Sequence, residues 1–282
     1  MFLDALTDTF IDGIKILPFL FVTYVLMEYI EHKAGSKAER FVKKSGRLGP
    51  VVGSILGVVP QCGFSAAAAN FYAGRIITLG TLISIFLSTS DEMLPILISE
   101  KVSPVLIFHI LGMKIVIGMI AGFVIDLILH RKGKEESEMR IEHMCDHEHC
   151  HCDEQNIFKS ALVHTLQIFA FIVVISFALN ILIAIVGEDK LGSFMTSVPA
   201  LGILLSGLIG LIPNCAASVV ITQLYLEGLL TMGSMMAGLL VGSGIGLLVL
   251  FRVNEDMKEN LKITTMLYVI GIACGFLIDL IL

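Results

Sequence analysis

Residues 53–65 read GSILGVVPQCGFS, and residues 206–218 read SGLIGLIPNCAAS. Both segments place a proline, an amide side chain and a cysteine in the middle of an apolar run. Proline removes a backbone donor and disfavours helix in the residue before it, so each segment is expected to be a helix that breaks. Inside a membrane, broken backbone is tolerated only where it lines a cavity. The paired breaks therefore predict a site near the midplane of a membrane protein.

The composition of the chain indicates that class. The sequence has 282 residues, of which 56% are hydrophobic and 16% are charged. A soluble domain is typically ~45–50% apolar and ~25% charged, so we expect an all-α polytopic membrane protein. These values exclude an intrinsically disordered chain, a secreted disulfide scaffold and a nucleic-acid binder. The N-terminus lacks the basic region of a signal peptide, so the first apolar segment should stay in the protein.

The two breaks belong to a duplication. Residues 50–129 align with residues 203–282 at a constant offset of 153, with 23 identities over 80 positions. We therefore expect repeat 1 at 1–130, a linker rich in histidine and cysteine at 131–156, and repeat 2 at 157–282. Two repeats in a membrane protein are typical of transporters.

Loop charges predict the orientation of the repeats. The loop at 31–48 carries six basic residues, whereas the matching loop at 187–199 carries only Lys190. The first should be cytoplasmic and the second external, which makes the repeats inverted. The central loop is then cytoplasmic, and both termini are external.

Hydropathy is compatible with two different numbers of membrane crossings. Clear spans lie at about 10–30, 104–129, 160–186 and 261–282. Between the first two, residues 48–98 hold either three short crossings or one crossing with re-entrant hairpins. The first gives ten transmembrane helices and is preferred; the second gives six.

The candidate substrate ligands are polar side chains that recur in both repeats. Oxygen and sulfur atoms beside a helix break can bind an ion, whereas the alternative is a proline kink with cysteine as a small apolar residue. A second cluster, at 88–92, contains two acidic residues within an apolar region. These acids either take part in transport or cap the N-terminus of a helix. The predicted substrate-binding residues are Gln61, Cys62, Ser65, Asn214, Cys215, Ser218, Asp91, Glu92, Ser90 and Ser243.

Three further charged residues lie in apolar spans. Lys114 could pair with an acid or extend to the membrane interface. Asp126 and Asp279 occupy equivalent positions near helix ends and are interpreted as structural or interfacial.

The linker predicts a metal-binding loop. Imidazole and thiolate groups suit zinc, copper, cobalt and nickel, and a short tract rich in both is typical of metal binding. The spacing matches no defined zinc finger, so we expect a flexible loop that captures or senses a divalent metal; the alternative is a solvated linker. The predicted ligands are His143, Cys145, His147, His149, Cys150, His151 and Cys152.

The chain resembles a known family through the PQCGFS stretch at 60–65, the STSDE stretch at 88–92 and the GSGIGLLVLFR stretch at 242–252. It is similar to the ten-helix heavy-metal exporters of prokaryotes, whose members carry labels such as arsenic efflux protein or manganese transporter. The resemblance implies ten helices, a plasma-membrane location and efflux of a metal or metalloid.

The leading hypothesis is therefore a secondary transporter that exports a heavy-metal or metalloid ion. The alternatives are a carrier of anions or organic solutes, and a membrane metal sensor. An enzyme is not expected, and neither is a nucleotide-binding loop, a required cofactor or a nucleic-acid partner. The expected partners are the lipid bilayer and the ion, and a homo-oligomer is left open.

Overall fold

The computed structural model describes residues 48–59, 62–90, 93–131, 199–213 and 215–281, with isolated positions at 17–25 and 162–177. The described part is helical and contains no strand, which confirms the all-α prediction. Repeat 1 contributes α3 (Gly49–Gly57), α4 (Cys62–Ala73), α5 (Leu79–Ser88), α6 (Met93–Ser99) and α7 (Pro104–Arg131). Repeat 2 contributes α11 (Pro199–Gly210), α12 (Cys215–Leu226), α13 (Met232–Val241), α14 (Gly246–Val253) and α15 (Met257–Ile281).

The helices of the two repeats begin and end at matching residues. The bounds of α12 and α13 are those of α4 and α5 moved by 153 residues. The caps match as well, because the side chains of Thr78 and Thr231 accept hydrogen bonds from the backbone at the first turns of α5 and α13. The duplication seen in the sequence is thus also a duplication of local structure.

A carboxylate fixes each of these caps to the long helix of its own repeat. Asp126 in α7 accepts hydrogen bonds from the Thr78 hydroxyl at 2.8 Å and from the Gly80 amide at 2.8 Å. In repeat 2, Asp279 accepts from the Thr231 hydroxyl and from the backbone amide two residues later, both at 2.6 Å. The structural interpretation of the two aspartates is confirmed, because each joins two helices of the fold.

The helices form an inner and an outer set. An 18-residue apolar window of Met232–Val253, which comprises α13 and α14, is 89% buried, whereas the windows of Met257–Ile281 and Pro104–Leu129 are 28% and 33% buried. Most exposed side chains of α7 and α15 are apolar, as with Phe108 and Val116 on α7. Since lipid tails can cover such a surface, α7 and α15 form the outer set and α5 and α13 the inner set.

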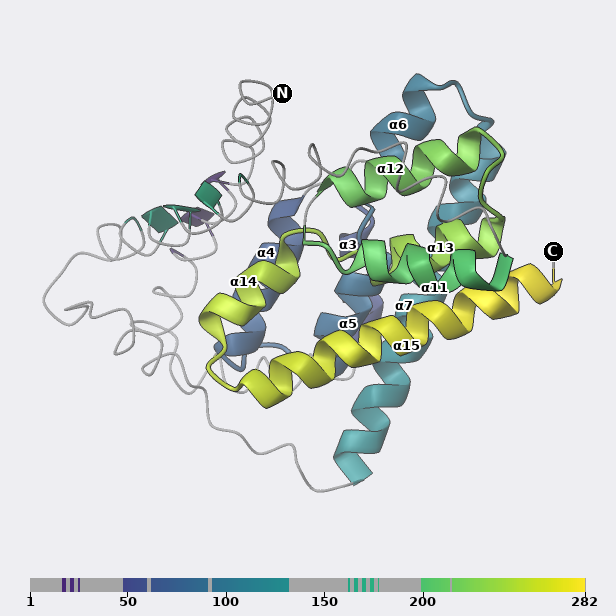
Figure 1. Ribbon diagram of the computed structural model, residues 1–282. Coiled ribbons are helices and arrows are strands. Elements are labelled where there is room, and N and C mark those ends of the chain that lie inside the picture. Colours follow the sequence, from purple (N-terminus) through teal and green to yellow (C-terminus); the bar gives the residue numbers. More distant parts are fainter. Residues whose placement is uncertain are drawn as a thin grey trace, which may run out of the picture.

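The repeats exchange helices. Figure 1 shows α4 of repeat 1 beside α14 of repeat 2, and α6 of repeat 1 beside α12 of repeat 2; both pairs are in contact. Within each repeat, α5 packs on α3 and α7, and α13 packs on α11 and α15. Each repeat therefore supplies short helices that complete the other one.

In the described part, four apolar stretches are long enough to cross a membrane: Leu79–Ser99, Pro104–Leu129, Met232–Val253 and Met257–Ile281. The helices α3 and α4 have 9 and 12 residues, which is shorter than the ~20 residues of a full span. The expectation of short or broken helices between the clear spans is confirmed. The clear spans predicted at 10–30 and 160–186 lie almost entirely outside the described residues.

Candidate functional site

The predicted helix breaks are present in both repeats. The first lies between the end of α3 at Gly57 and the start of α4 at Cys62, and the second between the end of α11 at Gly210 and the start of α12 at Cys215. Two further breaks separate α5 from α6 and α13 from α14, at 89–92 and at 242–245. The clusters that sequence analysis selected therefore lie at interruptions of helices.

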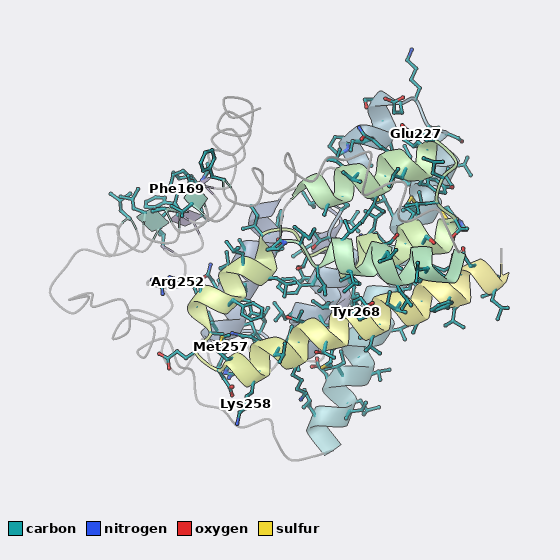
Figure 2. The ribbon with its side chains drawn as sticks, in the orientation of Figure 1. Phe169, Glu227, Arg252, Met257, Lys258 and Tyr268 are labelled. Atoms are coloured by element: carbon teal, nitrogen blue, oxygen red, sulfur yellow. The ribbon has the colours of Figure 1, made fainter. Side chains whose placement is uncertain are left out.

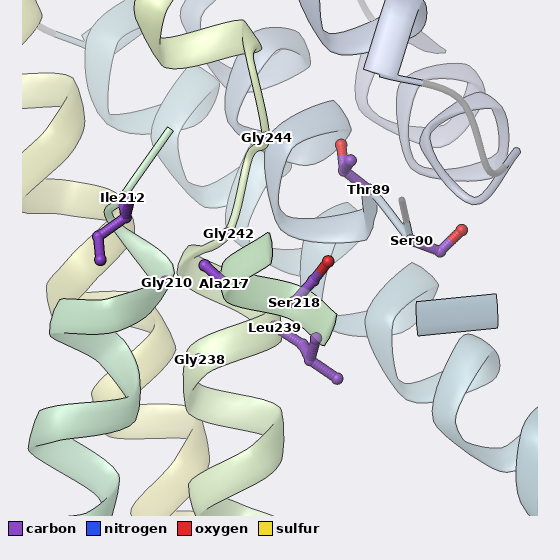
Figure 3. Close-up of a pocket in the computed structure, with 10 residues that line it drawn as sticks. All are labelled: Thr89, Ser90, Gly210, Ile212, Ala217, Ser218, Gly238, Leu239, Gly242 and Gly244. Carbon is purple, nitrogen blue, oxygen red and sulfur yellow. The ribbon is translucent and has the colours of Figure 1, made fainter. Parts of the chain in front are cut away.

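A small cavity joins three of these breaks. It has a volume of about 10 Å³, which is room for one water molecule or a similarly small particle. The described residues that line it come from both repeats: Thr89, Ser90, Gly210, Ile212, Ala217, Ser218, Gly238, Leu239, Gly242 and Gly244. Figure 3 shows Ser218 beside Leu239, with Thr89 and Ser90 across from them and the link between Gly242 and Gly244 along one side.

Glycines let two helices meet closely at the wall of the cavity. A Cβ atom on Gly210 would collide with the backbone carbonyl of Gly238, so α11 and α13 cross in direct backbone contact at the cavity wall. Repeat 1 has the same kind of crossing, because a Cβ atom on Gly57 would lie 2.7 Å from the backbone carbonyl of Ile85, the residue equivalent to Gly238. Glycine at both positions lets the two helices approach without filling the space beside them.

The equivalent serines of the two repeats have different hydrogen bonds. The Ser90 hydroxyl donates to the backbone carbonyl of Val58, which follows the last residue of α3. The Ser243 hydroxyl is buried, and within the described part of the chain it has no hydrogen-bond partner. A buried hydroxyl without a partner costs about 1–3 kcal/mol, which sets Ser243 apart from Ser90.

The structure separates the predicted ligands into three groups. Ser90 and Ser218 line the cavity, and Ser243 lies between two residues that line it. Ser65 is buried in α4 and packs against Gly246 of α14, outside the lining. Outside the described residues or side chains lie Gln61, Asn214, Asp91, Glu92, Cys62 and Cys215, and also the loop ligands at 143–152, so their roles remain predictions.

One buried cation lies beside the cavity. Lys114 of α7 is 0% exposed, and its Nζ donates a hydrogen bond to the backbone carbonyl of Leu239 in α13 at 2.6 Å. Leu239 is one of the residues that line the cavity. Of the two alternatives for Lys114, extension to the membrane interface is wrong, because its side chain is buried between the two repeats, and pairing with an acid stays a prediction.

A polar cluster that sequence analysis missed joins the repeats at another place. Glu259, in the first turn of α15, accepts hydrogen bonds from both terminal nitrogens of Arg75 at 3.1 and 2.9 Å and from the Tyr72 hydroxyl at 2.6 Å. The Asn254 amide donates to the same carboxylate at 3.2 Å. We call these four residues the Arg75–Glu259 clamp; in Figure 2, Met257 and Lys258 mark the end of the molecule where it lies.

The clamp exists at only one of the two equivalent places. The positions that correspond to Arg75 and Glu259 in the other repeat are Gly228 and Leu106. Arg75 and Gly228 both have a positive φ, 57° and 75°, so the turn is shared although the charge is not. Burial acts to lower the pKa of Arg75, but the hydrogen bonds and charge of Glu259 outweigh it and raise that pKa, so the guanidinium stays charged. No sequence signal pairs residues that are 184 positions apart.

A second cavity, a groove of about 510 Å³, lies between α7 and α15 on the apolar outer surface and includes Met113 and Cys274 in its lining. It is separate from the helix breaks.

Comparison with known proteins assigns the family. The model of the family described as "Putative, 10TM heavy-metal exporter" matches residues 1–186. No curated protein and no solved structure matches the chain. The match covers about two thirds of the sequence and includes the first pair of helix breaks and Lys114. Together with the apolar spans, it identifies the chain as a multi-pass membrane protein that belongs to this family of heavy-metal exporters.

Proposed function

We propose that the protein is a secondary transporter that exports a heavy-metal or metalloid ion, such as manganese or arsenic, through the cavity between its repeats. The observation that carries the proposal is the lining of that cavity, to which residues at helix breaks of both repeats contribute. Broken helices at a repeat interface are where secondary transporters bind their substrates. Movement of one repeat against the other would open such a site to either side in turn.

The chemistry of the site favours a small polar or ionic substrate. Its described polar side chains are the hydroxyls of Thr89, Ser90 and Ser218, and the neighbouring Ser243 hydroxyl has no hydrogen-bond partner within the described residues. The predicted ligands Asp91 and Glu92 directly follow Ser90 in the sequence. The helix breaks at Pro60 and Pro213 each add an amide and a thiol side chain. Manganese prefers oxygen ligands, whereas thiols suit softer ions, so Cys62 and Cys215 are proposed for a metalloid such as trivalent arsenic.

The proposed arrangement in the membrane follows from the loop charges. The repeats are inverted, both termini are external, and the loop at 143–152 is cytoplasmic. There its histidines and cysteines would gather or sense metal before export.

The proposal is tested by accumulation of arsenite and of Mn²⁺ in a metal-sensitive bacterial strain. Cells with the wild-type protein are compared with Ser218→Ala and with the double variant Cys62→Ala/Cys215→Ala. The matched controls are Ser99→Ala at the exposed end of α6 and Cys274→Ala in the outer groove. Protein amounts in the membrane are measured in parallel, so that lost export is separated from lost expression.

We expect the wild type and both controls to lower cellular arsenite or Mn²⁺. Ser218→Ala should weaken export of either ion, and the double cysteine variant should weaken export of arsenite alone. Unchanged accumulation of both ions with the wild type would overturn metal export and favour an anion or organic-solute carrier. A protein that moves no ion, but whose metal-dependent response is lost when residues 143–152 are deleted, would be a sensor.

A further inference from the structure

The Arg75–Glu259 clamp ties the two repeats together at one end of the molecule. Arg75 follows α4 of repeat 1, whereas Glu259 lies in the first turn of α15 and Asn254 in the link between α14 and α15. Tyr72 supports the pair from repeat 1, because its hydroxyl donates to Glu259 and the centre of its ring lies 5.2 Å from the guanidinium carbon. A movement that separates these parts of the two repeats must therefore break the clamp.

The clamp is strong enough to favour one conformation and weak enough to open. The Arg75 and Glu259 side chains are 18% and 23% exposed, so water can reach them and replace their hydrogen bonds. A bidentate ion pair with this exposure changes the ratio of two conformations by about fivefold. Such a pair suits a contact that breaks and forms repeatedly.

The opposite end of the molecule has a different chemistry. Gly228 and Leu106 stand at the equivalent positions there and cannot form an ion pair. Figure 2 shows Glu227, which precedes Gly228, far from Met257 and Lys258 at the clamp end. The two ends thus share their helices and turns but differ in what holds them together.

Packing differs between the two ends in the same sense. The helix α14, at the clamp end, has five buried residues, whereas its equivalent α6 has two: Gly246, Leu247, Leu248, Val249 and Leu250 against Met93 and Leu97. A Cβ atom on Gly246 would lie 2.7 Å from Ser65 Cβ, so α14 and α4 are in close contact. On α6, the Ile98 side chain is 61% exposed. Among the described residues, the molecule is therefore more tightly closed at the clamp end.

We propose that the Arg75–Glu259 clamp is a latch that holds the transporter closed at its cytoplasmic end. The inference rests on the proposed function, since it concerns the same movement of one repeat against the other. In the proposed arrangement the C-terminus is external and α15 crosses the membrane once, so its first turn, with Glu259, is cytoplasmic. The latch opens when the repeats rock to admit an ion from the cytoplasm, and it forms again when they rock back.

The position of the latch at one end has a consequence for transport. Since the opposite end lacks the ion pair, the empty protein rests with its cytoplasmic end closed. An ion shifts this equilibrium only as far as it binds the open conformation more tightly than the closed one. The clamp therefore sets how much cytoplasmic ion is needed before export begins.

The test is hydrogen exchange of backbone amides, measured by mass spectrometry on the full-length protein in lipid nanodiscs without added metal. Exchange is followed at the clamp end, in the turn after α4 and the α14–α15 link, and at the opposite end, in the turn after α12 and the α6–α7 link. Arg75→Ala breaks the latch, and Tyr72→Phe removes only one of its hydrogen bonds. The charge-swapped variant Arg75→Glu/Glu259→Arg restores an ion pair, and Lys258→Ala removes an exposed charge next to the clamp as the matched control.

We expect Arg75→Ala to speed exchange at the clamp end by up to about fivefold and to slow exchange at the opposite end, because opening one end closes the other. Tyr72→Phe should shift both ends in the same directions by less, which keeps the test valid if Arg75→Ala does not fold. The charge-swapped variant should return both ends toward the wild type. Lys258→Ala should leave both unchanged.

Three results would overturn the inference. The first is faster exchange at the clamp end with no change at the opposite end, because the clamp then only stabilises its surroundings. The second is unchanged exchange at both ends in Arg75→Ala. The third is the same opposite changes in Lys258→Ala, which would assign the effect to net charge. Exchange needs no substrate, so opposite changes at the two ends in a protein that moves neither Mn²⁺ nor arsenite would overturn the proposed function and not the latch.

Discussion

The close crossing of α5 and α7 makes Gly122→Ala a quantitative test of the fold. A Cβ atom on Gly122 would lie 2.6 Å from the Gly80 carbonyl, 2.8 Å from Pro50 Cβ and 3.1 Å from Ser84 Cβ. Ordinary contacts begin at 3.4 Å, so α7 must move from α5 by about 0.8 Å. Overpacking of this kind costs about 1–3 kcal/mol. Gly112→Ala on the same helix meets nothing within 4 Å and is the matched control.

The assay is the thermal midpoint of the detergent-solubilised protein, followed by fluorescence-detected size exclusion. At about 2–4 °C per kcal/mol, Gly122→Ala should melt about 2–12 °C below Gly112→Ala. Gly275→Ala should behave like Gly122→Ala, because its Cβ would lie 2.7 Å from the Gly233 carbonyl and 2.8 Å from Ala237 Cβ. Equal midpoints for Gly122→Ala and Gly112→Ala would refute the close crossing.

Two more predictions concern polar contacts. Arg75→Ala and Glu259→Ala should each lower the thermal midpoint, and the double variant should lower it by less than the sum of the two single effects. The coupling energy should be about 1 kcal/mol, because the ion pair is bidentate but partly exposed. Additive effects would mean that the clamp contributes no stability. Asp279→Asn should lower the free energy of unfolding by about 1–2 kcal/mol, since it replaces a charged acceptor of two hydrogen bonds by a neutral one, and Asp126→Asn should match it. A larger loss in one repeat would show that the two caps are not equivalent.

The sequence located the helix breaks because their causes are local. Proline and its neighbours interrupt a helix wherever they stand, so Pro60 and Pro213 were sufficient to predict where α3 and α11 end. The duplication was also visible in the sequence, because the residues that form equivalent helix caps recur at one constant offset between the repeats. The same reasoning predicted structural roles for Asp126 and Asp279 from their equivalent positions alone.

The positions of polar side chains between the repeats could not be predicted in this way. Lys114 had two plausible environments, and only the tertiary structure brought its Nζ to the Leu239 carbonyl of α13. Glu259 gave no signal, because its partner Arg75 lies 184 residues away. Ser65 and Ser218 occupy equivalent sequence positions, yet only Ser218 lines the cavity.

The sequence by itself determined the class of protein, the repeat, the helix breaks and the resemblance to the exporter family. These properties depend on composition and on residues close together in the chain. The tertiary structure decided that α4 packs with α14 and α6 with α12, that the cavity lies against repeat 2, and that a lysine is buried beside it. The physical reason is that the two repeats share one sequence pattern and offer similar apolar surfaces twice, so the choice among partners depends on packing between distant segments.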